Sequence, residues 1–161
     1  MLWSMLDARG PENGATPQAV EVDAQTLAVA QRIGPRTRLG LLPMHHGLEI
    51  MGVARRLARA FEVLGDRVVI LDAEGPLGQD GQDESGRPAA LERALEDASR
   101  LSHRVLVVFP PSRVSGFALS LASAMDGVLL ISRPGGTTEF RLHKLQRQID
   151  VRRRLGVLLV E

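Results

Sequence analysis

Five short apolar runs constrain the fold of this chain more than any other feature of its sequence. RVVILD at 67–72 is the clearest, because its unbroken series of branched apolar residues is typical of a strand buried on both faces. Strands of this kind belong to parallel sheets, in which helices cover both sides. The other runs are TRLGLLP at 37–43, RVLVVF at 104–109, DGVLLISR at 126–133 and GVLLVE at 156–161.

The segments between these runs have the spacing of amphipathic helices. Residues 50–65, for example, place Val53, Leu57 and Phe61 on one face and arginines on the other. The predicted helices cover 21–33, 50–65, 88–101 and 115–125, and a last one follows the turn at 134–140 and runs to about Arg153. Strands that alternate with helices imply right-handed crossovers, so we expect a three-layer α/β/α fold with a mostly parallel sheet of about five or more strands.

The composition limits the number of domains and the classes of partner. A chain of 161 residues suits one domain with a sizeable core, and we expect a mobile tail at 1–20 followed by a single domain at 21–161. A formal net charge of +1 and an aromatic content of 3% argue against a nucleic-acid partner. No apolar run approaches the ~18 residues that span a bilayer, so we expect a cytoplasmic protein without direct membrane insertion.

Ligands of such folds bind at the carboxyl ends of the strands, where polar residues follow two of the apolar runs. The candidate binding residues are His45, His46, Gly47, Asp72 and Glu74. Adjacent histidines point in different directions and lack a third ligand at helical spacing, so no metal site is predicted. The two histidines are either solvated or capping residues, or they contact a ligand. The two acids have a structural alternative, since they can cap a loop or pair with an arginine.

The order of these segments resembles that of the MinD/ParA-like deviant P-loop ATPases. It is most similar to the branch that holds the cytoplasmic ATPase domains of bacterial tyrosine autokinases, which partner chain-length regulators of capsule and exopolysaccharide synthesis. The similarity covers about residues 37–161 and implies a P-loop NTPase-like fold. The motifs that carry it are Asp72-Ala73-Glu74, Val108-Phe109-Pro110-Pro111, Asp126-Gly127-Val128 through Arg133, and Thr137-Thr138.

The chain departs from that family at the positions that would hold ATP and Mg²⁺. In the register that aligns the helices, the last glycine of the phosphate loop falls on Glu49, the lysine on Ile50 and the Mg²⁺-binding hydroxyl on Met51. The Walker B aspartate falls on Val108. Isoleucine cannot neutralise phosphate charge, and a glutamate repels it, so the resemblance implies a site that has lost tight ATP–Mg²⁺ binding.

These departures lead to one preferred function and two alternatives. The chain contains no tyrosine, which excludes tyrosine autophosphorylation of its own residues. We therefore expect an inactive pseudo-ATPase that needs no cofactor and that regulates or scaffolds exopolysaccharide or capsule synthesis. Its expected partner is a membrane chain-length regulator, another polysaccharide-synthesis protein or an active homologue, with recruitment to the inner membrane by that partner and with homodimerisation as a further expectation. The alternatives are a nucleotide-binding ATPase or sensor with a remodelled loop, which would use ATP and Mg²⁺, and a MinD/ParA-like positioning protein.

Overall fold

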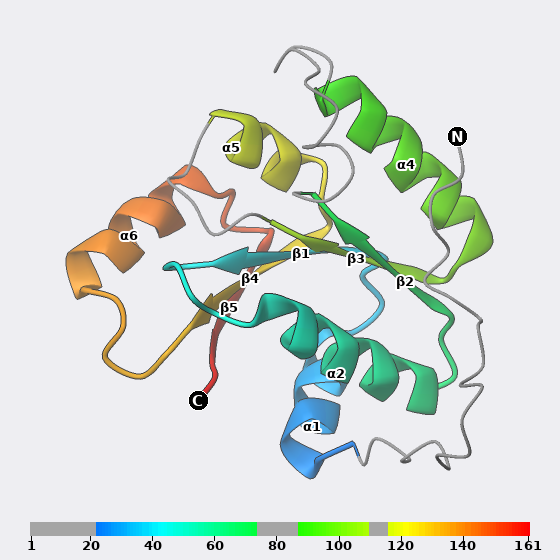
Figure 1. The fold of residues 1–161 in the computed structure, drawn as a ribbon, viewed down its shortest axis with the longest axis horizontal. Helices are drawn as coiled ribbons and strands as arrows, with labels where there is room; N and C mark the ends of the chain where they lie inside the picture. The colour runs from blue at the N-terminus through cyan, green and yellow to red at the C-terminus, as the bar shows by residue number, and fades with distance from the viewer. Residues whose placement is uncertain (1–21, 74–86, 110–115) are drawn as a thin grey trace.

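The five apolar runs form five parallel strands of one sheet in the computed structural model, which describes residues 22–73, 87–109 and 116–161 (Figure 1). The expected tail at 1–20 lies outside the described residues. The sheet order is β2-β3-β1-β4-β5, so β1 is central and β2 and β5 are the edges. The strands are β1 (Arg38–Pro43), β2 (Val68–Asp72), β3 (Arg104–Val108), β4 (Gly127–Ser132) and β5 (Arg154–Leu159).

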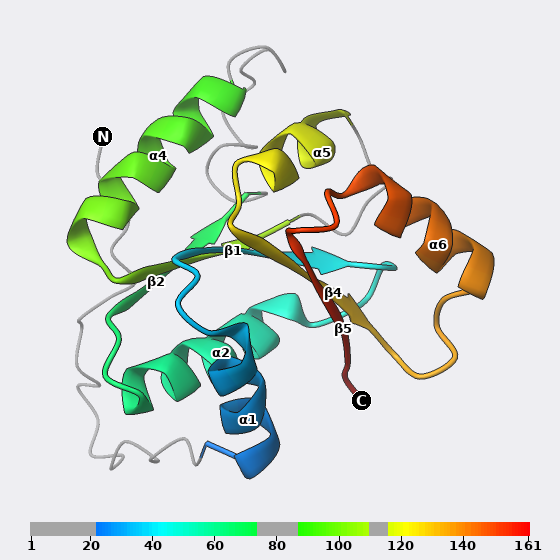
Figure 2. The ribbon, with the colours of Figure 1, turned by 180° about the vertical axis from the view of Figure 1, so that it is seen from behind.

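Helices cover both faces of this sheet, which confirms the predicted three-layer fold (Figure 2). One face carries α1 (Ala24–Ile33) and α2 (Ile50–Val63), and the other carries α4 (Arg87–Leu101), α5 (Gly116–Ser123) and α6 (Glu139–Gln148). Two apolar cores result, one on each side of the strands. None of the helices in the described ranges is long and apolar enough to cross a membrane.

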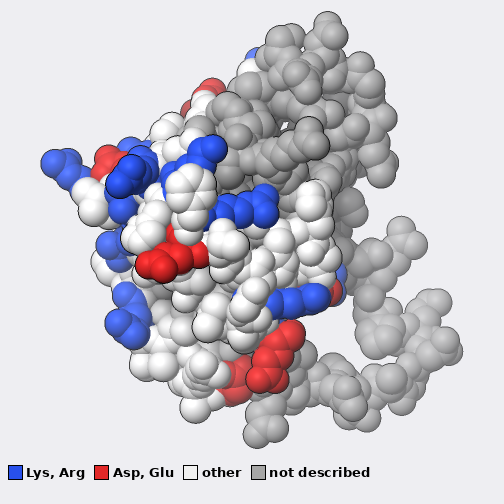
Figure 3. Space-filling view, turned by 90° about the vertical axis from the view of Figure 1, so that its left-hand side faces the viewer, with Lys and Arg blue, Asp and Glu red and all other residues white. Residues whose placement is uncertain are grey.

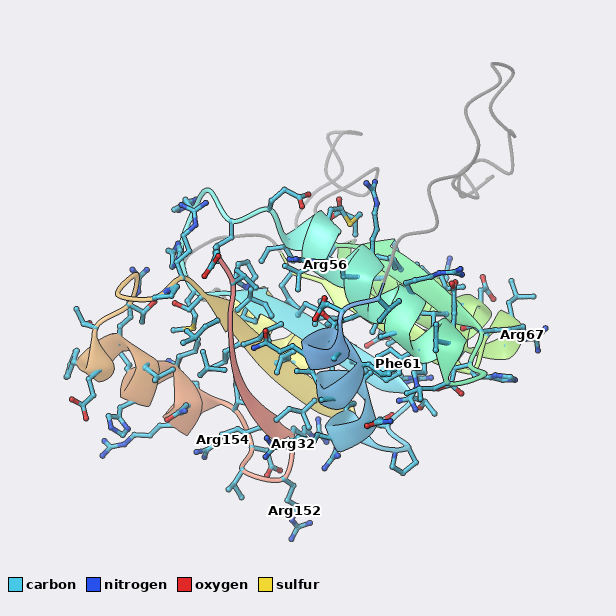
Figure 4. The ribbon with its side chains drawn as sticks, turned by 90° about the horizontal axis from the view of Figure 1, so that it is seen from below. Arg32, Arg56, Phe61, Arg67, Arg152 and Arg154 are labelled. Carbon is cyan, nitrogen blue, oxygen red and sulfur yellow. The ribbon has the colours of Figure 1, made fainter. Side chains whose placement is uncertain are left out.

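In the core between the sheet and the helices α1 and α2, the largest side chain is Phe61, which has no exposed surface. It lies on the side of α2 that faces the sheet (Figure 4). Arg104 at the start of β3 covers its ring, with the guanidinium carbon 4.2 Å from the ring centre. The same guanidinium donates hydrogen bonds to Asp66 and to the carbonyl of Arg36, so it joins three segments at the amino end of the sheet.

Asp126 and Gly127 tie β4 to β1 at the same end of the sheet. One carboxylate oxygen of Asp126 accepts hydrogen bonds from the Thr37 N–H at 3.1 Å, the Thr37 hydroxyl at 2.8 Å and the Arg38 N–H at 2.9 Å. A Cβ at Gly127 would lie 2.7 Å from the side chain of Leu155 on β5. The sequence motif at 126–128 therefore has a structural function. Asp126 is hydrogen-bonded to the start of β1, and Gly127 leaves room for the Leu155 side chain of β5.

The last helix is shorter than predicted, and the last strand starts earlier. Helix α6 ends at Gln148 instead of about Arg153, because Ile149 adopts an extended conformation and is buried in the core with 4% exposure. Asp150 then accepts a hydrogen bond from the Arg152 N–H at 2.9 Å and starts a turn. Arg152 projects from this turn, and the strand β5 that follows is an edge strand with exposed Val157 and Leu159 (Figure 4).

Candidate functional site

The loop of residues 44–49 lies at the carboxyl end of β1 and leads into α2, which is the position that the sequence predicts for a phosphate loop. Figure 3 looks onto this end of the sheet, where basic side chains form several separate clusters on a largely uncharged described surface, with a few smaller acidic patches. The loop is tied to the neighbouring strand from its first residue, because the Met44 N–H donates to the carbonyl of Ile131 on β4 at 2.9 Å.

His45 binds the turn between β4 and α6. Its Nε2 accepts a hydrogen bond from the Arg133 N–H at 3.1 Å, which requires the neutral ring with its proton on Nδ1. The Arg133 guanidinium donates in return to the carbonyl of Gly47 at 2.8 Å. A Cβ at Gly136 would lie 2.6 Å from the same Nε2, so the ring needs a glycine at that position of the turn.

Glu49 and Ile50 close the other end of the loop. The Ile50 N–H donates to the carbonyl of Leu48 at 3.0 Å, and Glu49 has the φ of −82° and ψ of 76° of an inverse γ-turn. The Glu49 carboxylate folds back onto α2, where it lies so close to Gly52 that a methyl group there would overlap it. A negative charge in the first turn of a helix is favourable, so the chain's own carboxylate occupies the place where a bound anion would gain the same interaction.

The structure does not gather the predicted site residues into one centre. Asp72 ends β2 and pairs in register with Val108 on β3, so β3 separates it from the loop after β1. At a strand spacing of about 4.8 Å, the ends of β2 and β1 lie about 10 Å apart, and His45 turns toward β4 on the far side. His46 is exposed, and Glu74 lies outside the described residues. No group of three His, Cys, Asp or Glu that could hold a metal ion exists in the described ranges.

The side chains that do converge near the loop come from the turn at 133–138 and from α6, and sequence reasoning missed them as site residues. A groove of about 440 Å³ runs between the end of β1 and α6. It contains Lys144, the only lysine of the chain, which lies within α6. The residues that line it are Pro43, Met44, Thr138, Phe140, Arg141, Lys144, Leu145 and Gln148.

Comparison with known proteins finds relatives of this fold only among solved structures. No family model and no curated protein matches the chain. The BceF tyrosine kinase domain has a TM-score of 0.58 and 15% identity over 84% of this chain and 74% of its own. The chimerical protein CapA2B2 has a TM-score of 0.62 and 12% identity over 84% and 80%, respectively.

Two further kinase domains have the same arrangement. The VpsO kinase domain has a TM-score of 0.59 and 15% identity over 84% of this chain and 95% of its own. The kinase domain of the Escherichia coli tyrosine kinase ETK has a TM-score of 0.59 and 16% identity over 83% and 70%. The five-stranded parallel sheet with helices on both faces is therefore the fold of these tyrosine kinase domains.

Proposed function

We propose that this chain is a catalytically inactive relative of the polysaccharide tyrosine autokinases and acts by binding another protein. The observation that carries the proposal is the state of the loop at 44–49. The His45 ring and the Gly47 carbonyl are bound to Arg133, and the N–H of Ile50, directly after the loop, donates to the carbonyl of Leu48. A phosphate loop needs free N–H groups that converge on the anion, and the Ile50 N–H is not free for this purpose.

The residue types at this end of the sheet support the same conclusion. The Glu49 carboxylate stands at the start of α2, and Ile50 and Met51 follow it where a lysine and a hydroxyl would serve phosphoryl transfer. Val108, at the end of β3, is buried with 7% exposure and has no group that could bind Mg²⁺. Several charge-stabilising groups are thus missing together, and each is worth orders of magnitude in rate in enzymes of this kind.

The partner that we propose is a membrane chain-length regulator, another component of polysaccharide synthesis or an active homologue of this chain. This choice comes from the resemblance to the autokinases and from the kinase-domain fold. In that role the α/β framework supplies a surface, and no cofactor is required. Co-purification of the full chain with a chain-length regulator from the same organism tests the partner, and its failure under conditions in which an active kinase domain co-purifies speaks against it.

Calorimetric titration with ATP and with ADP, each with Mg²⁺, tests the inactivity. We expect no saturable heat from this chain, and the ETK kinase domain under the same conditions is the positive control. Binding in the micromolar range, or phosphate release above the buffer rate, refutes the proposal. Such a result favours the alternative of a nucleotide sensor with a remodelled loop, in which alanine at His46 or Asp72 would abolish the binding.

A further inference from the structure

The groove between the end of β1 and α6 combines an apolar floor with a basic rim. Met44 and Leu145 are each 5% exposed and form part of the floor, together with the buried Pro43. Phe140 stands at the groove with 80% of its surface exposed, which is unusual for an aromatic side chain without a partner. A floor and an aromatic wall of this kind favour a ligand with an apolar part.

The basic rim consists of Arg141 and Lys144, whose charged groups are both free in the described part of the chain. Neither side chain has a hydrogen bond or ion pair there, and no residue that lines the groove is acidic. Glu139, the acid at the start of the helix, does not line the groove, and its carboxylate lies 3.6 Å from the His143 ring. Two adjacent cations without a counter-charge favour an anionic ligand.

The dimensions of the groove match an extended segment of chain. Its lining on α6 runs from Thr138 to Gln148, and ten residues of helical rise correspond to about 15 Å. An extended peptide of about four or five residues covers that length at ~3.3 Å per residue. Arg141 and Lys144 are three positions apart on the helix, so their Cβ atoms are ~5–6 Å apart, close to the ~6.6 Å between alternate side chains of an extended peptide.

We propose that this groove binds an extended acidic peptide in which two carboxylates alternate with apolar residues. The carboxylates pair with Arg141 and Lys144, and the apolar side chains between and beside them pack on Met44, Leu145 and Phe140. The inference rests on the proposed function, which it deepens, because it names the surface that receives the partner and the chemistry of the partner segment.

Fluorescence polarisation with a labelled five-residue peptide tests this inference on the full 161-residue chain. The peptide alternates leucine or phenylalanine with two glutamates, and a second peptide carries glutamine in place of both glutamates. We expect saturable binding of the first peptide and about tenfold weaker binding of the second, because each exposed charge pair contributes a modest amount. Absence of saturable binding by the acidic peptide overturns the inference.

Charge reversal on α6 provides the matched control. Arg141→Glu and Lys144→Glu should each weaken the acidic peptide about tenfold, whereas Arg147→Glu on the same helix should leave it within about twofold. Arg147 is exposed and does not line the groove, so it reports the effect of net charge alone. Equal weakening by all three variants shows diffuse electrostatic attraction and overturns the proposed site. All three side chains lie on the surface, and circular dichroism verifies that each variant is folded.

Competition with ATP separates this inference from the proposed function. ATP that displaces the peptide from the groove identifies a nucleotide as the occupant and overturns the peptide assignment. ATP that binds without displacing the peptide refutes the inactivity of the loop and leaves the groove as proposed. A chain that binds neither ATP nor the peptide retains its proposed inactivity and loses only the inference about the groove.

Discussion

Replacement of Asp126 tests whether the motif at 126–128 serves the fold. The carboxylate accepts three hydrogen bonds from Thr37 and Arg38, at the point where β1 and β4 begin. Asp126→Ala removes all three at once and leaves two backbone N–H groups without their acceptor. Asp126→Asn retains an oxygen of the same shape and loses only the charge.

The size of the effect follows from these contacts. A hydrogen bond to a charged acceptor contributes about 1.5–3 kcal/mol when it is shielded from water. Asp126 is on the exposed surface and its three hydrogen bonds share one oxygen, so their joint contribution is smaller than three separate shielded bonds would give. We expect a loss of unfolding free energy of about 2–3 kcal/mol for Asp126→Ala and about 1 kcal/mol for Asp126→Asn. For a domain of this size, the larger loss lowers Tm by about 5–10 °C.

The contribution also depends on pH in a defined direction. Partial burial raises the pKa of the Asp126 carboxyl, but hydrogen bonds from Thr37 and Arg38 outweigh it, so the pKa lies below its ordinary value of 3.8. A group with a lowered folded-state pKa stabilises the protein above its unfolded-state pKa, and this stability is lost as the pH falls through the folded-state value. The difference between wild type and Asp126→Asn is therefore constant above about pH 5 and shrinks below 3.8.

Urea denaturation followed by circular dichroism at pH 7, 5 and 3 measures these differences. Asp97→Asn is the control, because Asp97 is an exposed acid with one long contact to Arg100 at 3.9 Å, and we expect it to change stability by less than about 0.5 kcal/mol. An Asp126→Ala variant as stable as the control refutes the structural reading of the motif. A difference between wild type and Asp126→Asn that persists undiminished at pH 3 refutes the argument from charge.

Three further substitutions have defined outcomes. Gly40→Ala should destabilise the protein by about 1–3 kcal/mol in urea denaturation, because its Cβ would lie 2.5 Å from the Phe109 ring; an unchanged midpoint contradicts this. Arg104→Met should cost about 2–4 kcal/mol in the same assay, since it leaves the carboxylate of Asp66 with only a long contact to His103 at 3.9 Å, and a more stable variant would be the contrary result. Arg133→Ala should speed amide hydrogen exchange across residues 44–50 without creating ATP binding. Exchange at the wild-type rate would show that the contacts with Arg133 do not order the loop.

The strands were predictable because their signal is local. Each strand is an apolar run in the sequence, and the structure places all five in one parallel sheet, in which the edge strands β2 and β5 are only partly buried. The end of α6 was not predictable in the same way, since the apolar spacing continues into Ile149 and only the packing of that residue against the core decides that the helix stops. Local patterns define elements, whereas tertiary contacts decide where some of them end.

In the candidate site, too, local sequence patterns predict the position of an element, whereas tertiary contacts decide what its side chains bind. The position of the loop after β1 followed from the order of the elements, but its contacts did not. His45 binds a residue 88 positions away, and nothing in the sequence around either residue indicates the pair. The groove likewise joins the end of β1 to α6, so Met44 and Lys144 become neighbours only once the sheet order places β1 beside β4.

The contact between His45 and the turn at 133–138 makes this ring a natural spectroscopic probe. The turn that holds the ring ends at Thr138, which caps α6 and also lines the groove. Movement of α6 around a bound segment therefore changes the environment of the imidazole Nε2. The chain has only four histidines, so nitrogen chemical shifts of the labelled ring can be assigned by single substitutions and followed during a titration.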